Sequence, residues 1–191
     1  YLPVLLCSIY GLRRSEVLGI KWSCVDFENN TIHICETLQQ STKELTGESN
    51  YTDDTKNASS NRTMPLIPVI KEKLLVHKQW QFENKKEFEE LYSDSDFVFT
   101  HENGSVMTPN YLTKNFRRIA DSLGYHGLRL HDLRHSVASN LLNKGFSYVQ
   151  TAEWLGHSNP STTFRFYAHV DKTSKIAIAS DYEPVSYTHL R

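Results

Sequence analysis

Polar side chains suited to binding an anion fall on one short stretch near residue 130. His131, Arg134 and His135 are three and four positions apart, so on an α-helix they project together, away from the apolar side that carries Leu133 and Val137. An arginine fork donates two parallel hydrogen bonds to phosphate or carboxylate oxygens, and an imidazole can donate a hydrogen bond or move a proton near neutral pH. The spacing therefore predicts a polar helix face on which these three side chains converge.

Two more candidates follow on the next predicted helices. Leu-Gly-His at residues 155–157 ends a helix at a glycine turn, where a tight backbone can aim the imidazole of His157. Tyr167 comes ten residues later, and a phenol becomes a competent nucleophile when cations and a base favour its phenolate. The set therefore places two candidate histidines, an arginine and a tyrosine on adjacent helices within 37 residues.

Duller interpretations fit some of the same residues. His131 and His135 could be zinc ligands completed by His157 or His169, although no Glu stands where a metalloprotease motif needs one and Arg134 would repel a dication. Tyr167 lies three residues after Phe164, a spacing that also suits a buried helix face. Taken one by one, these residues leave the alternatives open.

Hydrophobic periodicity predicts a mainly α-helical domain with a small antiparallel β-sheet near its start. A polar stretch at 37–61 is too hydrophilic for burial and is expected to be a mobile loop. We expect helices at 2–10, 15–22, 68–92, 108–123, 130–144, 147–155, 160–168 and, weakly, 171–180, strands at 25–27, 31–35 and 62–66, and a short strand or extended link at 97–99.

Composition is that of one globular domain: 191 residues, 39% hydrophobic and 23% charged. No run of apolar residues is long enough for a transmembrane helix. Three cysteines at irregular spacing suit neither a disulfide framework nor a paired-thiolate zinc site, so a reducing cytoplasm is expected.

The net charge of −1 hides an uneven distribution, because residues 108–169 hold seven Lys and Arg against three Asp and Glu. A local surplus of positive charge permits a nucleic-acid partner, although it is also common on solvated surfaces.

Five segments, taken together, resemble the signature motifs of the tyrosine recombinase (phage integrase) family. In family order they are Gly-Leu-Arg-Arg-Ser-Glu at 11–16, a β-hairpin lysine motif at 56–66, His-Asp-Leu-Arg-His at 131–135, Leu-Gly-His at 155–157 and Phe-Tyr-Ala-His at 166–169. The amino-acid sequences of several of these motifs are similar to those of integrases of conjugative transposons and phages of Gram-positive bacteria. The resemblance implies an α+β fold, namely the mainly helical catalytic domain of a tyrosine recombinase with a small antiparallel sheet.

The resemblance also implies a chemistry for the matching residues. Tyr167 would attack a DNA phosphodiester and form a 3′-phosphotyrosine, while Arg13 and Arg134 would bind the non-bridging oxygens, on which charge grows in the five-coordinate transition state. Because the covalent link conserves the phosphodiester energy, a 5′-hydroxyl can rejoin the strand without ATP. No metal ion or other cofactor is expected.

The remaining motif residues would assist that reaction. His157 would bind the same phosphate oxygens, and His131 would position the phosphate or help take the phenolic proton. Lys56 would protonate the departing 5′ oxygen, as the family's hairpin lysine does. Glu16 and Asp132 are expected to orient an arginine or a histidine.

By the same resemblance the partners are double-stranded DNA and other copies of the chain, with a tetramer on DNA performing strand exchange and no membrane involved. Three alternative functions remain open. A type IB-like topoisomerase would use the same chemistry, a metal-dependent nuclease would need a cation, and a non-enzymatic DNA-binding module would form no covalent adduct.

We expect residues 1–181 to be the catalytic domain, lacking its first helices because the chain opens inside an apolar segment without Met. Residues 182–191 do not resemble the family's final helix and are expected to be a tail foreign to the domain.

Overall fold

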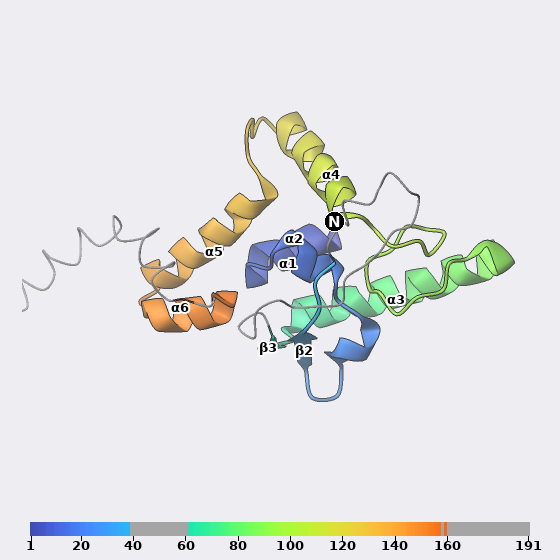
Figure 1. The fold of residues 1–191 in the computed structure, drawn as a ribbon, viewed down its shortest axis with the longest axis horizontal. Coiled ribbons are helices and arrows are strands. Elements are labelled where there is room, and N and C mark those ends of the chain that lie inside the picture. Colours follow the sequence, from blue (N-terminus) through green and yellow to red (C-terminus); the bar gives the residue numbers. More distant parts are fainter. Residues whose placement is uncertain (39–60, 158, 160–191) are drawn as a thin grey trace, which may run out of the picture.

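The computed structural model describes residues 1–38, 61–157 and 159. A three-stranded antiparallel sheet lies at one edge of a group of helices, with α1 near the centre (Figure 1), so the predicted fold class is confirmed. In chain order the elements are α1 (Leu2–Tyr10), α2 (Arg14–Leu18), the 3-10 turn η1 (Trp22–Cys24), β1 (Val25–Asp26), β2 (Thr31–Ile34), β3 (Arg62–Pro65), α3 (Pro68–Phe88), the 3-10 turn η4 (Glu89–Leu91), α4 (Pro109–Ser122), α5 (Leu130–Asn143) and α6 (Tyr148–Leu155).

Helix α1 is the centre of the core because almost every residue in it is apolar. Leu6 and Tyr10 are buried, and the Tyr10 hydroxyl donates to Pro65 O at 2.9 Å while accepting from the N–H of Ile67 at 3.2 Å. The helix ends at Gly11, whose φ of 67° is left-handed and whose N–H bonds to Cys7 O. These contacts fix α1 against β3.

The sheet has the order β1-β2-β3, and each neighbouring pair is antiparallel. Ile32 and Ile34 of β2 are buried, whereas the alternate Thr31 and His33 are only partly covered, as expected when one face of a sheet packs on a core. In this register Ile34 lies opposite Arg62, which places Arg62 on the inner side.

Helix α5 packs against α1 and α6 (Figure 1), and Trp154 of α6 stacks on Tyr10 of α1 with ring centroids 6.0 Å apart. Val137 and Ala138 of α5 form a small hydrophobic cluster with Leu155 of α6. Ser147 caps α6 by accepting from the N–H of Gln150 at 3.2 Å, and α6 ends at Gly156 with a left-handed φ of 69°. The end of α6 is thereby brought close to the turn that follows α1.

One predicted element differs from the structure, and the structure decides between two forms for another. The helix expected at 15–22 ends at Leu18, because the backbone of Ile20 and Trp22 bonds to Val98 and Asp96 instead of continuing the helical ladder. At 97–99, predicted as a short strand or an extended link, the structure has no strand and only an isolated bridge from Phe97 to Lys21.

Several predictions fall on residues outside the described ranges. They are most of the 37–61 loop, the helices at 160–168 and 171–180, and the 182–191 tail. None of the helices described here combines the length and apolarity of a membrane span.

Candidate active site

A buried carboxylate organises the cationic residues of the site. Glu16 stands in the first turn of α2 and is fully buried. Its Oε2 accepts from the backbone N–H of Arg13 at 2.9 Å, and its Oε1 lies 2.5 Å from Arg13 Nη1. Arg62 Nη2 is 3.2 Å and Arg134 Nη1 is 4.0 Å from Glu16 Oε2. Three guanidinium groups from distant parts of the chain therefore surround one negative charge.

The same three arginines bind the carbonyl end of α6. Arg62 Nε donates to Trp154 O at 3.1 Å, Arg134 Nη2 to Leu155 O at 2.7 Å and Arg13 Nη2 to Gly156 O at 3.3 Å. The last carbonyls of a helix lack intrahelical partners and carry partial negative charge. The end of α6 thus helps to hold the cations in place.

The arginines differ in their access to solvent. The Arg13 side chain is 36% exposed, whereas those of Arg62 and Arg134 are 9% and 3% exposed. Arg134 also donates to Gly11 O at 2.6 Å, so it joins α5 to the turn after α1. Arg13 is the member of the group most open to an incoming ligand.

The placement of Arg134 corrects one prediction from helical spacing. It does not share a solvent-facing side with the two neighbouring histidines, since the buried residues of α5 are Leu130, Arg134, Val137 and Ala138. Positions 130, 134, 137 and 138 follow the apolar stripe of the helix, and Arg134 is accommodated there because Glu16 and backbone carbonyls satisfy its charge and its donors.

His131 lines a cationic cavity next to Arg13. Burial lowers the pKa of His131, and His135 and Arg134 lower it further; the rings of His131 and His135 meet edge to face with centroids 4.9 Å apart. The cavity has a volume of about 390 Å³ and no acidic residue among those that line it. Its lining residues are Leu12, Arg13, Arg14, Ser15, Thr113, Arg129, Leu130 and His131.

His157 lies directly after the glycine turn that ends α6. Burial lowers its pKa to about 4, assisted by the charges of Arg134 and Arg13, so its ring is neutral at pH 7. It lines a second cavity of about 760 Å³ together with Arg62 and Asn61. The structure thus brings His157 to the arginine group, on a different cavity from His131.

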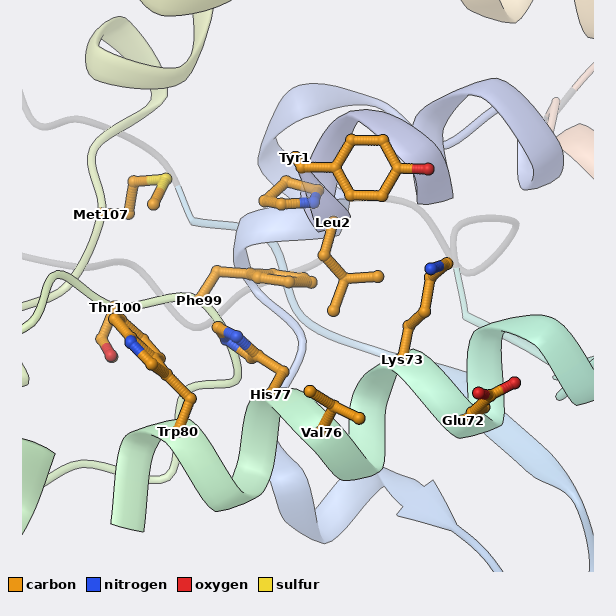
Figure 2. A pocket seen from close by; sticks show the side chains of 11 residues that line it. Tyr1, Leu2, Glu72, Lys73, Val76, His77, Trp80, Phe99, Thr100 and Met107 are labelled. Carbon is orange, nitrogen blue, oxygen red and sulfur yellow. The ribbon is translucent and has the colours of Figure 1, made fainter. Parts of the chain in front are cut away.

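A third hollow, of about 500 Å³, lies at the start of α1 and differs in chemistry (Figure 2). His77, Trp80 and Phe99 form its aromatic wall, and it contains no arginine. His77 bonds to Val98 O through Nε2 at 2.8 Å and stacks on Trp80. Its one lysine, Lys73, stands beside Glu72 in the lining, so the hollow has no arginine fork and no surplus of positive charge to hold a phosphate.

Within the described residues the zinc alternative finds no support. His131 and His135 adjoin each other, but they do not form a group of three metal ligands with His157 in that part of the chain. The third proposed partner, His169, lies outside the described residues.

Two features of the site were not predicted from the sequence. The sequence predicts no role for Arg62, although this residue stands in the 56–66 motif. Its place opposite buried Ile34 in the sheet register is the signal that indicates an inward-facing side chain. Asp132 does not orient a site residue as Glu16 does, because its carboxylate accepts from the backbone and side chain of Arg129 at the start of α5. Asp132 is the third residue of α5, where its partly exposed side chain completes a capping box with the N-cap residue Arg129.

Comparison with known proteins shows the family. The model of the phage integrase family matches residues 1–174. The chain belongs to the phage integrase family. As a member, it is 32% identical over 185 residues to a tyrosine recombinase XerC-like protein of Caldanaerobacter subterraneus, covering 90% of this chain and 46% of the relative. It is 28% identical over 183 residues to the integrase of Staphylococcus phage L54a, covering 94% of this chain and 50% of that protein.

A solved transposon integrase structure has the same fold. The Tn1549 transposon integrase in complex with transposon right end DNA aligns with a TM-score of 0.75 and 25% sequence identity. The alignment covers 95% of this chain and 58% of the Tn1549 integrase chain. The expected resemblance to phage and transposon integrases is confirmed. The chain spans about half the length of the curated relatives it matches.

Two predicted residues of this phage integrase family site, Tyr167 and Lys56, lie outside the described residues. Their positions relative to Arg13 and Arg134 stay predictions.

Proposed function

We propose that this chain is the catalytic part of a site-specific DNA recombinase, which cleaves one strand through Tyr167, forms a 3′-phosphotyrosine and rejoins the strand to another 5′ end. The observation that supports it best is the convergence of Arg13 and Arg134 on Glu16 and the end of α6. The family membership and the DNA complex of the Tn1549 integrase support DNA as the substrate.

The arginines supply the electrostatic part of the reaction. A phosphodiester repels nucleophiles, and its transition state places more charge on the two non-bridging oxygens, so cations fixed in advance lower the barrier without reorganisation. Arg13 is held by Glu16 but remains one-third exposed, and Arg134 is fixed beneath it. Loss of one such donor typically costs about 100- to 1000-fold in rate.

The histidines and the lysine donate hydrogen bonds and transfer protons in the reaction. His157, neutral at pH 7 because of its lowered pKa, donates a hydrogen bond to a non-bridging oxygen. His131, whose pKa is also lowered, is a neutral base suited to the phenolic proton of Tyr167. Lys56 protonates the departing 5′ oxygen. The covalent bond forms at phosphorus as the 5′ P–O bond breaks, and religation reverses both steps.

A tetramer on two DNA duplexes is the assembly in which four such exchanges produce recombination. This separates the proposal from a type IB-like topoisomerase, which would relax supercoils as a monomer. Transfer of a labelled strand from one duplex to another supports the recombinase, and supercoil relaxation without transfer supports the topoisomerase.

The deciding experiment is the capture of the covalent intermediate. The protein, extended to full length where this chain alone does not bind, is incubated in EDTA with a cognate site nicked so that the cleaved strand diffuses away. We expect a denaturant-resistant protein–DNA species in the wild type that Tyr167→Phe abolishes and that Tyr125→Phe, an exposed control in the turn after α4, retains. An adduct that survives Tyr167→Phe would show that another residue is the nucleophile.

A further inference from the structure

Two cysteines and a histidine gather on the outer face of the sheet, opposite the inner face that carries Ile34 and Arg62. Val25 pairs with Ile32, so the same register continued by one residue sets Cys24 opposite His33. Cys35 follows His33 by two positions and therefore projects to the same side of the chain. The Sγ atoms of Cys24 and Cys35 are 3.2 Å apart, and the ligand atoms of all three residues lie within 4.8 Å of one another.

These atoms are almost at the separations that a tetrahedral zinc site needs. Zn–S bonds of about 2.3 Å and Zn–N bonds of about 2.0–2.1 Å place ligand atoms about 3.6–3.8 Å apart. Adjustment of side-chain torsions covers the difference. Two thiolates and an imidazole are also ligands that Zn²⁺ prefers over harder cations.

The surroundings of His33 fit a metal ligand. Its Nε2 lies 2.6 Å from Asn61 Oδ1, and ligating histidines typically direct their second ring N–H to such an acceptor, which fixes the tautomer. With Nε2–H donating to Asn61, the lone pair resides on Nδ1. Asn61 adjoins Arg62, so the contact also joins β2 to the start of β3.

Nearby carboxylates have other partners. Asp26 accepts from the N–H groups of Glu28 and Asn29 in the hairpin turn, and Glu36 pairs with Lys21 at 2.6 Å. Among the described residues the group of metal ligands is limited to Cys24, His33 and Cys35. The fourth coordination position would be taken by solvent.

We propose that Cys24, His33 and Cys35 bind one Zn²⁺ ion, with water as the fourth ligand, on the outer face of the β-sheet. Binding replaces two thiol protons by two Zn–S bonds and releases both protons, with no change of oxidation state. The ion links η1 to the end of β2 and, through Asn61, to β3. It takes no part in strand cleavage, so this site and the proposed recombinase activity can fail independently.

The test uses Co²⁺ as a spectroscopic probe on the whole chain, reduced with a phosphine and then desalted. We expect one equivalent of Co²⁺ to give thiolate-to-metal charge-transfer absorption with tetrahedral d–d bands, and Zn²⁺ to displace it. Cys24→Ser and Cys35→Ser should abolish the charge-transfer band, whereas Cys7→Ala, at the buried cysteine of α1, should retain it. Asn61→Ala should weaken Co²⁺ binding by about 10- to 100-fold.

A second measurement needs no variant and so does not depend on the folding of the serine proteins. Saturating Zn²⁺ should protect Cys24 and Cys35 of the wild type from alkylation, as mapped by mass spectrometry. Absence of the charge-transfer band in the reduced wild type, or its persistence in both serine variants, would overturn the proposal. Equal alkylation with and without Zn²⁺ would do the same.

Discussion

Arg62 Nη2 lies 3.2 Å from Glu16 Oε2, which places a cation of β3 on the same buried carboxylate that holds Arg13. The Arg62 fork also reaches Trp154 O through Nε at 3.1 Å. One planar side chain thereby fixes the strand, the α2 carboxylate and the end of α6 relative to one another. Because Arg13 depends on the same carboxylate, the position of Arg62 sets the position of Arg13.

We expect Arg62→Lys to slow DNA cleavage while leaving DNA affinity within roughly twofold. The variant keeps the positive charge, but an ammonium is a point donor and cannot span Trp154 O and Glu16 as a planar fork does. Displacement of a catalytic group by about 1 Å can cost about 100-fold, so a loss of about 10- to 100-fold in the single-turnover cleavage rate is expected.

A matched control for this change is Lys85→Gln, which removes an exposed pair with Asp94 on the far part of α3. Its cleavage rate should equal that of the wild type. Wild-type cleavage by Arg62→Lys would show that Arg62 has no positioning role, and parallel losses of rate and affinity would indicate general damage to the fold instead.

Replacing Glu16 by Gln tests the carboxylate itself. Burial opposes the ionised form most strongly, but Arg62, Arg13 and the hydrogen bonds together hold the pKa of Glu16 below its usual range. Removing the charge leaves three guanidinium groups to repel one another in a buried place, where breaking an ion pair costs about 3 kcal/mol or more. Urea unfolding at pH 7 should show a loss of about 3 kcal/mol.

The pH dependence of that loss identifies its cause. Since the pKa of Glu16 is lower in the folded state, its contribution is complete above the unfolded value of about 4.3 and is lost as pH falls through the folded value. The difference in unfolding free energy between wild type and Glu16→Gln should therefore shrink below about pH 4. A difference that stays constant down to pH 3 would mean that the charge is not what matters. Glu87→Gln, exposed on α3, should stay within about 0.5 kcal/mol of the wild type.

The elements were predictable where each buries one continuous side. Helix α4 illustrates this, since Leu112, Phe116 and Ala120 recur at helical spacing and are all buried. The hairpin was predictable for the same reason, with Ile32 and Ile34 alternating toward the core. Such patterns are local, so a single sequence contains them in full.

The site was predictable only in part, because its contacts are not local. Motif order identified Arg13, Arg134 and His157, but spacing along α5 could not show that Arg134 occupies a buried position, which depends on a carboxylate more than 100 residues earlier. Arg62 reaches Glu16 only through the register of β3 on β2. The contact between the Sγ atoms of Cys24 and Cys35 also depends on strand register, which a single sequence does not show.

His157 should remain neutral well below the usual range of a histidine. We expect NMR titration of its ring nitrogens to give a pKa of about 4. Because burial is the largest cause and Arg134 and Arg13 follow, Arg13→Gln should raise this pKa without restoring the ordinary value. Arg118→Gln, on the exposed side of α4, should leave it unchanged. An ordinary His157 pKa in the wild type would remove the basis for treating this ring as a neutral donor.

The lowered pKa of His157 also predicts a loss of stability in mild acid. Between about pH 6.5, the unfolded value, and about pH 4, the folded value, the unfolded chain binds a proton that the folded chain does not. The free energy of unfolding should therefore decrease as pH falls through this window. Measured by urea unfolding, the decrease should be smaller in His157→Asn, and equal slopes in both proteins would assign it to other groups.

Gly11→Ala tests whether the turn after α1 positions the arginine group. Gly11 has φ 67°, a methyl group there would clash with Leu155 Cδ2, and its carbonyl accepts from Arg134. Left-handed backbone costs a non-glycine residue about 1 kcal/mol and overpacking of a tight contact about 2 kcal/mol more, so urea unfolding should show a loss of about 3 kcal/mol. Gly124→Ala supplies the backbone cost alone, because its φ is 84° and no atom lies within 4 Å of the added carbon. If the two variants lose the same stability, the contact between Gly11 and Leu155 of α6 is not tight. The turn after α1 would then not be what fixes the position of the Arg134 guanidinium.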